Sequence, residues 1–220
     1  MNETPVSKRC EEILKKREHV LIGISPLNSY YSEDRITKLI HWGHTSFKEF
    51  HILTADTLSE YNFLAVGYPL KKAKKKTRQN WNSLYNKITR AFQSIGMTEE
   101  TYQKKIIALS GKLPENNIYK KLHDVCLERY KQDEAFRQKC MESSKMVLEN
   151  YGGAVVDSSL DIAINYLLGE LPFYLDTPRM LNVNSSLLVY HKAIPFFTDI
   201  YQDREKNLIA DTQGHLILEI

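Results

Sequence analysis

The sequence is poor in cysteine and contains no long apolar run. Its three cysteines, Cys10, Cys126 and Cys140, are odd in number and lack metal-ligand spacing, so we expect reduced thiols without a metal or disulfide role. Residues 1–16 hold no apolar run of signal-peptide length, and no stretch approaches the roughly 20 apolar residues that span a bilayer. These absences predict a cytoplasmic protein that binds neither membrane nor metal.

Length and composition fit one folded unit. With 220 residues, of which 42% are hydrophobic and 26% charged, the chain is large enough to bury a full core and too apolar to be disordered. We therefore expect a single domain over residues 1–220. The sequence leaves open whether this domain acts as a monomer or a dimer.

Acidic residues are also absent between Glu60 and Glu99, where eight basic residues lie. Because the whole chain is only +3 and this segment is +8, the remainder sums to −5. Apolar spacing predicts a helix whose later turns pack on the body and whose first turns stand in solvent. A solvated helix face is one interpretation, but the missing acids favour a polyanion site, for nucleic acid or anionic lipid. The basic residues are Lys71, Lys72, Lys74, Lys75, Lys76, Arg78, Lys87 and Arg90.

Residues 19–32 couple a buried strand to polar side chains. Residues 20–24 are apolar apart from Gly23, which suits a strand covered on both faces with one point of close backbone approach. Ser25 stands at the carboxyl end of this strand, the edge where ligands bind in open α/β sheets. Ser25 is therefore the first candidate for a reacting group, although Ser, Pro and Asn after a strand are also ordinary turn residues.

The same stretch argues against an α/β-hydrolase. Gly23-Ile24-Ser25 starts like a nucleophile elbow, but that motif needs Gly at the position of Leu27 and an N–H from the residue after the serine. Pro26 has no N–H. A serine esterase of this type is therefore disfavoured.

Strand and helix patterns alternate after this stretch. A helical pattern over residues 34–47 and a short strand at 50–53 complete a β-α-β unit, which predicts a parallel sheet with right-handed crossovers. We accordingly expect an α/β fold in which helices flank a mainly parallel sheet. Residues 208–220 are predicted to form a hairpin with its turn at Gln213 and Gly214.

A later helix carries Tyr166 and Glu170 four residues apart, and thus on one face. We expect Pro172 to end this helix. Glu170 then falls in the last turn beside apolar residues, where the helix dipole and poor solvation disfavour a carboxylate. A cation should meet it, either a Lys or Arg side chain or the α-ammonium of a substrate.

Residues 187–189 predict one more buried strand, which ends at Tyr190 and His191. This is the edge of the sheet where Ser25 is expected. An amphipathic tyrosine at a strand end is common, so the pattern by itself leaves a structural role open.

Three of these segments resemble the cyclodipeptide synthases, which join two amino acids taken from aminoacyl-tRNAs into a diketopiperazine. Together the matches cover about positions 19–195. Asn28, Tyr190 and His191 fit one of the two subgroups of the family, whereas Lys192-Ala193-Ile194 departs from an acidic position of some members. The matching residues are Gly23-Ile24-Ser25-Pro26-Leu27-Asn28-Ser29-Tyr30, Asn165-Tyr166 with Glu170-Leu171-Pro172-Phe173, and the run from Ser185 to Pro195.

The resemblance implies a Rossmann-like domain similar to the catalytic domain of class I aminoacyl-tRNA synthetases. It also implies two aminoacyl-tRNAs as substrates, no ATP, metal or other cofactor, and tRNA binding by the eight basic residues. The serine would be the nucleophile, Tyr and Glu would hold the amino group, and the second Tyr would relay a proton. The implied catalytic residues are Ser25, Tyr166, Glu170 and Tyr190, and the supporting residues are Asn28, His191, Tyr119 and Asn150.

By the same resemblance, a pocket beneath the nucleophile selects the amino acid. Each implied lining residue is apolar or lacks a side chain, so a hydrophobic amino acid is expected and a charged one is not. Gly23 leaves room while Phe173 fills space, which favours leucyl-tRNA and a product that is cyclo(Leu-Leu) or another hydrophobic pair. The implied lining is Leu21, Gly23, Leu109, Phe173 and Leu188.

Two other functions stay open. A catalytically inactive, class I synthetase-like protein would use the basic helix to bind tRNA, and a serine esterase would use the serine alone. The sequence contains neither His-Ile-Gly-His nor Lys-Met-Ser-Lys-Ser, so ATP-dependent aminoacylation is disfavoured.

Overall fold

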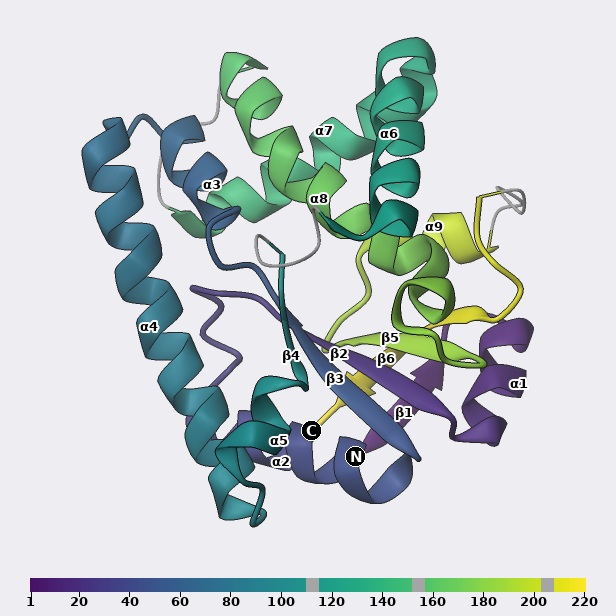
Figure 1. Ribbon diagram of the computed structural model, residues 1–220. Helices are drawn as coiled ribbons and strands as arrows, with labels where there is room; N and C mark the ends of the chain where they lie inside the picture. Colours follow the sequence, from purple (N-terminus) through teal and green to yellow (C-terminus); the bar gives the residue numbers. More distant parts are fainter. Residues whose placement is uncertain (110–114, 152–156, 203–207) are drawn as a thin grey trace.

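A mainly parallel sheet runs through the molecule (Figure 1). The computed structural model describes residues 1–109, 115–151, 157–202 and 208–220, except the side chains at 150, 157 and 158. Within these residues six strands are ordered β1-β6-β5-β2-β3-β4, and β2 to β6 run parallel, which confirms the expected α/β fold. The strands are β1 (Asn2–Pro5), β2 (His19–Ile24), β3 (Glu49–Thr54), β4 (Ile106–Ala108), β5 (Ser186–Tyr190) and β6 (Gln213–Glu219).

The strand β2 lies at the centre of the sheet and is buried on both faces. Ile22 is in register with Ile52 of β3 and with Val189 of β5. This register aligns the carboxyl ends of β2 and β5, so the residues that follow them share one edge of the sheet.

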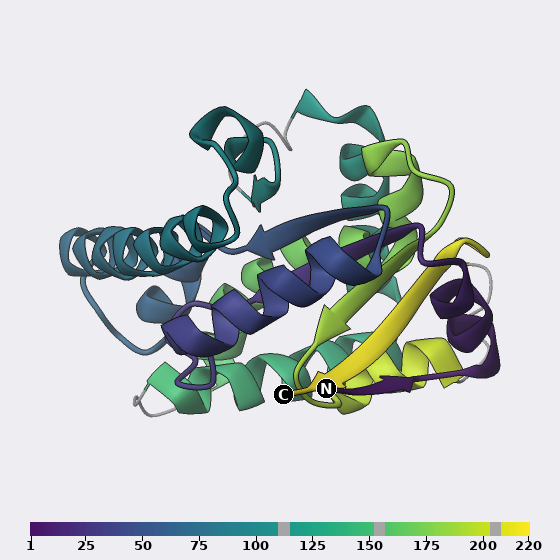
Figure 2. The same ribbon diagram turned by 90° about the horizontal axis from the view of Figure 1, so that it is seen from below.

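The predicted hairpin at residues 208–220 is wrong. Gln213 and Gly214 form the start of the single strand β6, which pairs in parallel with β5 and antiparallel with β1. The pairing of Asn2 with Glu219 places the two termini side by side (Figures 1 and 2). The strand partners are distant in sequence, so no local turn signal could indicate them.

Helices cover the sheet and extend beyond its edges. Figure 1 shows α3, α6, α7 and α8 grouped at one end of the molecule, with α2 and α5 at the other and α4 along one side. Figure 2 shows α4 projecting from the body. The described helices are α1 (Lys8–Lys16), α2 (Glu33–Ser46), α3 (Ser59–Ala65), α4 (Leu70–Ser94), α5 (Glu99–Gln103), α6 (Asn117–Gln132), α7 (Glu134–Leu148), the 3-10 turn η2 (Glu149–Tyr151), α8 (Asp157–Leu181) and α9 (Pro195–Gln202).

Helix α8 does not end at Pro172, as the sequence had led us to expect. It continues to Leu181 with a kink at Asp176, whose φ and ψ are not helical. The side chain of Asp176 accepts from the Arg179 N–H at 3.2 Å, and the Thr177 N–H donates to Gln213 Oε1 at 2.9 Å. These bonds satisfy N–H groups that the kink at Asp176 frees.

Candidate active site

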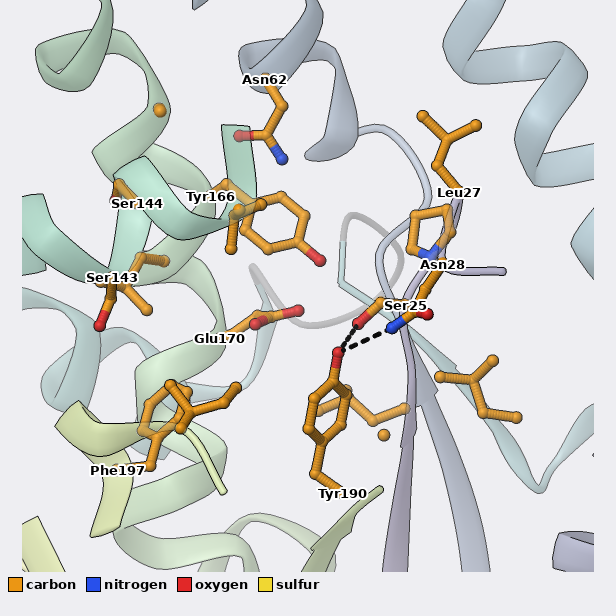
Figure 3. A pocket seen from close by; sticks show the side chains of 18 of the residues that line it. Ser25, Leu27, Asn28, Asn62, Ser143, Ser144, Tyr166, Glu170, Tyr190 and Phe197 are labelled. Atoms are coloured by element: carbon orange, nitrogen blue, oxygen red, sulfur yellow. Dashed lines mark hydrogen bonds between the residues drawn. The ribbon is translucent and has the colours of Figure 1, made fainter. Parts of the chain in front are cut away.

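Ser25 and Tyr190 meet at the carboxyl edge of the sheet. Ser25 follows β2 and Tyr190 ends β5, and the hydroxyls of the two side chains are 3.1 Å apart. The Asn28 side chain adds a third group, since its Nδ2 donates to the Tyr190 hydroxyl at 3.3 Å. Figure 3 shows these three side chains converging from two elements. The structure therefore brings together three of the predicted site residues.

The loop that carries Ser25 has a fixed shape. Asn28 Oδ1 accepts from the Tyr30 N–H at 3.0 Å, and the Ser32 hydroxyl caps α2 by accepting from the Arg35 N–H. Leu27 lies in the left-handed region with φ of 62°, which costs a residue with a β-carbon about 1–3 kcal/mol. Leu27 therefore occupies, with backbone strain, the position where a nucleophile elbow has glycine. The hydrogen bonds of Asn28 and Ser32 hold the loop in this conformation.

His191 supports this loop from behind. Its Nδ1 lies 3.1 Å from the Tyr31 hydroxyl, which donates to the Gly23 carbonyl oxygen at 2.7 Å. The His191 ring stacks on Tyr30 with centroids 4.1 Å apart. Burial, with Lys192 and Arg35 nearby, lowers the His191 pKa to about 4, so the ring is neutral at pH 7. Its contacts are therefore with the loop that carries Ser25.

Glu170 faces Ser25 from the opposite wall. Figure 3 shows the Glu170 carboxylate and the Tyr166 hydroxyl, both from α8, pointing toward Ser25. Burial raises the pKa of Glu170 to about 7, and the hydrogen-bonding Tyr166 side chain lowers it in part. Among the described residues no Lys or Arg side chain forms an ion pair with Glu170, so the protein partner allowed by the sequence is not found there. The carboxylate is available to an ammonium group.

These groups share one cavity of about 90 Å³ at the sheet edge. Its wall is mostly apolar, with Leu53, Leu167, Leu188 and Phe197 among the lining side chains. Three further polar side chains were missed by sequence reasoning. Asn62 on α3 and both Ser143 and Ser144 on α7 line the cavity, and the two serine hydroxyls are buried with no hydrogen-bond partner among the described atoms.

The predicted amino-acid pocket divides into two groups. Gly23 and Leu188 line this cavity. Leu21, Leu109 and Phe173 are buried but lie outside its described lining. Leu21 is one pleat further from the sheet edge than Gly23 and is in register with Leu188. Leu109 follows β4, and its backbone N–H donates to the Thr54 carbonyl oxygen. The Phe173 ring faces the Tyr119 ring, with centroids 6.0 Å apart.

The predicted supporting residue Tyr119 acts on the helix that carries the carboxylate. Its hydroxyl donates to the Gly169 carbonyl oxygen at 3.0 Å, next to Glu170 in the chain. Burial raises the Tyr119 pKa to about 12, which keeps this donor protonated. The side chain of Asn150, the other such prediction, lies outside the described part of the chain.

The basic residues lie on α4, as the pattern predicts. Arg90 forms a bidentate pair with Glu33 at 2.9 and 2.7 Å, so its charge is compensated. Lys72 and Lys76 lie over the Tyr68 ring at 4.7 and 5.3 Å. Lys71, Lys74 and the other cations of this end of the helix form no ion pair with a described residue. The exposed end of α4 is therefore a surface of uncompensated positive charge.

The fold and the site place this chain in the class of α/β proteins related to class I aminoacyl-tRNA synthetases. A solved Mycobacterium tuberculosis cyclodipeptide synthetase, described as related to type I tRNA synthetases, superposes with a TM-score of 0.84 at 28% identity and covers 98% of this chain and 91% of its own. Within that class, the family model for cyclodipeptide synthase matches residues 1–220, and the chain belongs to this family.

Two relatives support the assignment along nearly the whole chain. A cyclo(L-leucyl-L-leucyl) synthase from Staphylococcus haemolyticus is 30% identical over 97% of this chain and 92% of its own length. The cyclo(L-leucyl-L-leucyl) synthase of Bacillus subtilis is 28% identical over 97% of this chain and 87% of its own. The family and the fold expected from the three motifs are confirmed.

The residues that the structure describes contain neither a membrane-spanning helix nor a metal-binding cluster. No helix there is long and apolar enough to cross a bilayer. No cluster of three or more His, Cys, Asp or Glu side chains there is arranged to hold a metal ion.

Proposed function

We propose that this chain makes a cyclic dipeptide from two aminoacyl-tRNAs through acyl intermediates on Ser25, in the cytoplasm where charged tRNAs occur. The observation that carries the proposal is the meeting of the Ser25 and Tyr190 hydroxyls opposite the uncompensated Glu170 carboxylate. A nucleophile, a proton relay and an anchor for an ammonium group are the parts that an aminoacyl transfer needs.

The first step loads Ser25. Its Oγ attacks the ester carbonyl of the first aminoacyl-tRNA, an Oγ–C bond forms, and the bond from that carbon to the tRNA 3′-oxygen breaks. The serine proton passes to the departing 3′-oxygen, with the tRNA 2′-hydroxyl as a route. Because the ester is already activated, the step needs no ATP.

Glu170 and Tyr166 then hold the amino group of the loaded residue. An ammonium beside the carboxylate favours the ionised form of Glu170, which offsets the burial that raises its pKa. This contact orients the loaded residue for the next transfer.

Two amide bonds complete the ring. The loaded amino group, once neutral, attacks the ester carbonyl of the second aminoacyl-tRNA, which releases the second tRNA and leaves a dipeptide on Ser25. The new terminal amine attacks the Ser25 ester, the Oγ–C bond breaks, and the serine regains a proton through Tyr190. Two aminoacyl-tRNAs therefore give one diketopiperazine and two free tRNAs.

We propose leucine as the main amino acid, with cyclo(Leu-Leu) or another hydrophobic pair as the product. The apolar side chains Leu53, Leu167 and Leu188 of the cavity support this choice, and so do the two relatives that are named as cyclo(L-leucyl-L-leucyl) synthases. Leu21, Leu109 and Phe173 are buried and lie outside this lining.

Intact-protein mass spectrometry after exposure to leucyl-tRNA tests the proposal. We expect wild-type protein to gain one leucyl mass, the Ser25→Ala variant to gain none, and cyclo(Leu-Leu) to appear only with the wild type. An inactive tRNA-binding protein would bind tRNA without any mass gain. An esterase would release free leucine without the cyclic product, and either outcome would reject the proposal.

A further inference from the structure

A second cavity opens on the other side of the Ser25 loop. It holds about 240 Å³, compared with about 90 Å³ for the cavity that contains Glu170. Ser25, Pro26, Leu27 and Asn28 line both cavities, so the loop is the wall between them. A substrate that reacts at Ser25 therefore has room on both sides of the attacked carbonyl carbon.

The chemistry decides which half of the substrate enters which cavity. On the proposed function, the ammonium and side chain of the amino acid lie with Glu170 in the first cavity. The attacked carbon carries only one other large substituent, the ester oxygen with the nucleoside attached to it. The second cavity, which Ser25 also lines, has room for that substituent.

The far wall of the second cavity comes from α4. Asn80, Ser83 and Lys87 line it at intervals of three and four residues, which place them on one face of the helix. Neither Asn80 nor Ser83 makes a side-chain hydrogen bond with a described residue, so both are available to ribose hydroxyls or a base edge. Lys87 adds a cation that suits a phosphate.

The two walls are held at a fixed separation. Glu33 follows the cap of α2 directly after the Ser25 loop, and its carboxylate forms the bidentate pair with Arg90 on α4. The helices α2 and α4 also pack along each other. The second cavity is therefore a preorganised feature of the fold rather than a gap between independent parts.

We infer that this second cavity is the binding site for the 3′-terminal nucleoside of the aminoacyl-tRNA, with Lys87 on the phosphate at its 5′ side. The inference rests on the proposed function and adds the position of the leaving group. Lys76 and Lys72 continue the same face of α4, four and eight residues before Asn80.

A nucleoside probe tests this site without tRNA. The probe is 3′-leucylamino-3′-deoxyadenosine, whose amide resists cleavage, and its binding is measured by calorimetry. Ser83→Trp fills the cavity and is expected to weaken binding about tenfold or more. Asn82→Trp is the matched control, because Asn82 is an exposed neighbour on α4 outside the cavity, and it should change binding by less than about twofold.

A second pair of measurements tests the phosphate. Adding a 5′-phosphate to the probe should tighten binding to wild type about tenfold, and Lys87→Gln should remove that gain. The control Lys38→Gln, on the exposed side of α2, should keep it. Leucinamide, which lacks the nucleoside, should bind wild type and Ser83→Trp equally.

The nucleoside site would be rejected if Ser83→Trp and Asn82→Trp weakened probe binding equally. It would also be rejected if the 5′-phosphate still tightened probe binding to the Lys87→Gln variant. Loading of Ser25 by leucyl-tRNA is measured on the same wild-type protein. If loading proceeds and the probe results fail, only the nucleoside site is rejected, whereas absence of loading rejects the proposed function. Circular dichroism of each variant shows whether the fold is intact, and Lys87→Gln, a surface change, decides the outcome if Ser83→Trp is misfolded.

Discussion

The hydroxyl of Tyr190 lies 3.1 Å from the Oγ atom of Ser25, although the two residues are 165 positions apart. Burial raises the pKa of Tyr190, while the hydrogen bonds from Ser25 and Asn28 oppose this shift in part. Tyr190 is therefore protonated at pH 7, which suits its proposed role as a donor and relay better than that of a free base. The contact joins the loop that follows β2 to the end of the neighbouring strand β5.

Tyr190→Phe should separate loading from cyclisation. The change removes one hydroxyl and keeps the ring, so we expect Ser25 to be loaded while ring closure slows by about 10²- to 10⁴-fold, the usual contribution of acid–base catalysis. Mass spectrometry should then detect dipeptide retained on Ser25. Tyr61→Phe, at an exposed position on α3, is the control. If the Tyr190→Phe variant cyclises at the wild-type rate, the assignment of Tyr190 as the proton relay is rejected.

Glu170→Gln should weaken the hold on the amino group. The loss of a charge-assisted hydrogen bond of about 1.5–3 kcal/mol should shorten the lifetime of the loaded state or raise KM by about tenfold to a hundredfold. The wild-type loading rate should fall as pH drops below about 7, the pKa of this carboxyl in the empty site, and the variant should lose that dependence. Loading kinetics across pH measure both effects.

The same carboxyl should make folding stability depend on pH. Its pKa rises from 4.5 to about 7 on folding, so the folded state binds the proton more tightly and stability falls as pH rises through this window. Urea unfolding should therefore show that Glu170→Gln gains stability over wild type at about pH 8 and much less at about pH 5. Glu142→Gln, at an exposed site, should follow the wild type at both.

Neutralising the first turns of α4 should weaken tRNA binding in a salt-dependent way. With Lys71, Lys72, Lys74, Lys75, Lys76 and Arg78 changed to Gln, KM for charged tRNA should rise and the log–log salt slope should flatten. Each phosphate contact contributes about 0.7 to 0.9 units, so three lost contacts remove about two. An unchanged salt slope would show that tRNA binds elsewhere on the protein, or that the partner of this surface is anionic lipid.

A matched variant separates this effect from net charge. It replaces six exposed lysines outside α4 and so lowers the total charge equally. We expect its salt slope to stay near that of the wild type. The six are Lys15, Lys16, Lys38, Lys104, Lys120 and Lys121.

Ser143→Ala combined with Ser144→Ala should change the product profile. The two hydroxyls line the cavity without a described partner, and a buried hydroxyl left unpaired costs about 1–3 kcal/mol. Their removal should raise the share of purely aliphatic cyclic dipeptides about fivefold or more when the enzyme is offered mixed charged tRNAs. Chromatography with mass spectrometry measures this share. Ser159→Ala, buried on α8 outside the cavity, should leave the profile unchanged, and an equal change there would reject the assignment.

The sequence by itself determined the features that depend on neighbouring residues. The apolar run of β2, the serine at its end and the spacing of Tyr166 and Glu170 are local patterns. A local pattern sets a strand or a helix face through side-chain periodicity alone. The three motifs were sufficient for the family, because each one combines such a pattern with specific side chains.

Only the tertiary structure decided which distant groups meet. The hairpin prediction failed because the partners of β6 are β1 and β5, which a local reading of Gln213 and Gly214 does not reveal. Pro172 sits inside α8, and the helix kinks only at Asp176, where the distant Gln213 side chain satisfies the Thr177 N–H.

The cavity lining shows the same division. Asn62 and Ser143 become site residues only because α3 and α7 pack against α8, while Phe173 is turned toward Tyr119. The Glu170 carboxylate likewise stays without a cationic partner among the described residues because burial, and not sequence spacing, selects its neighbours. Packing contacts join residues that are far apart in the chain, so their identity depends on the whole fold.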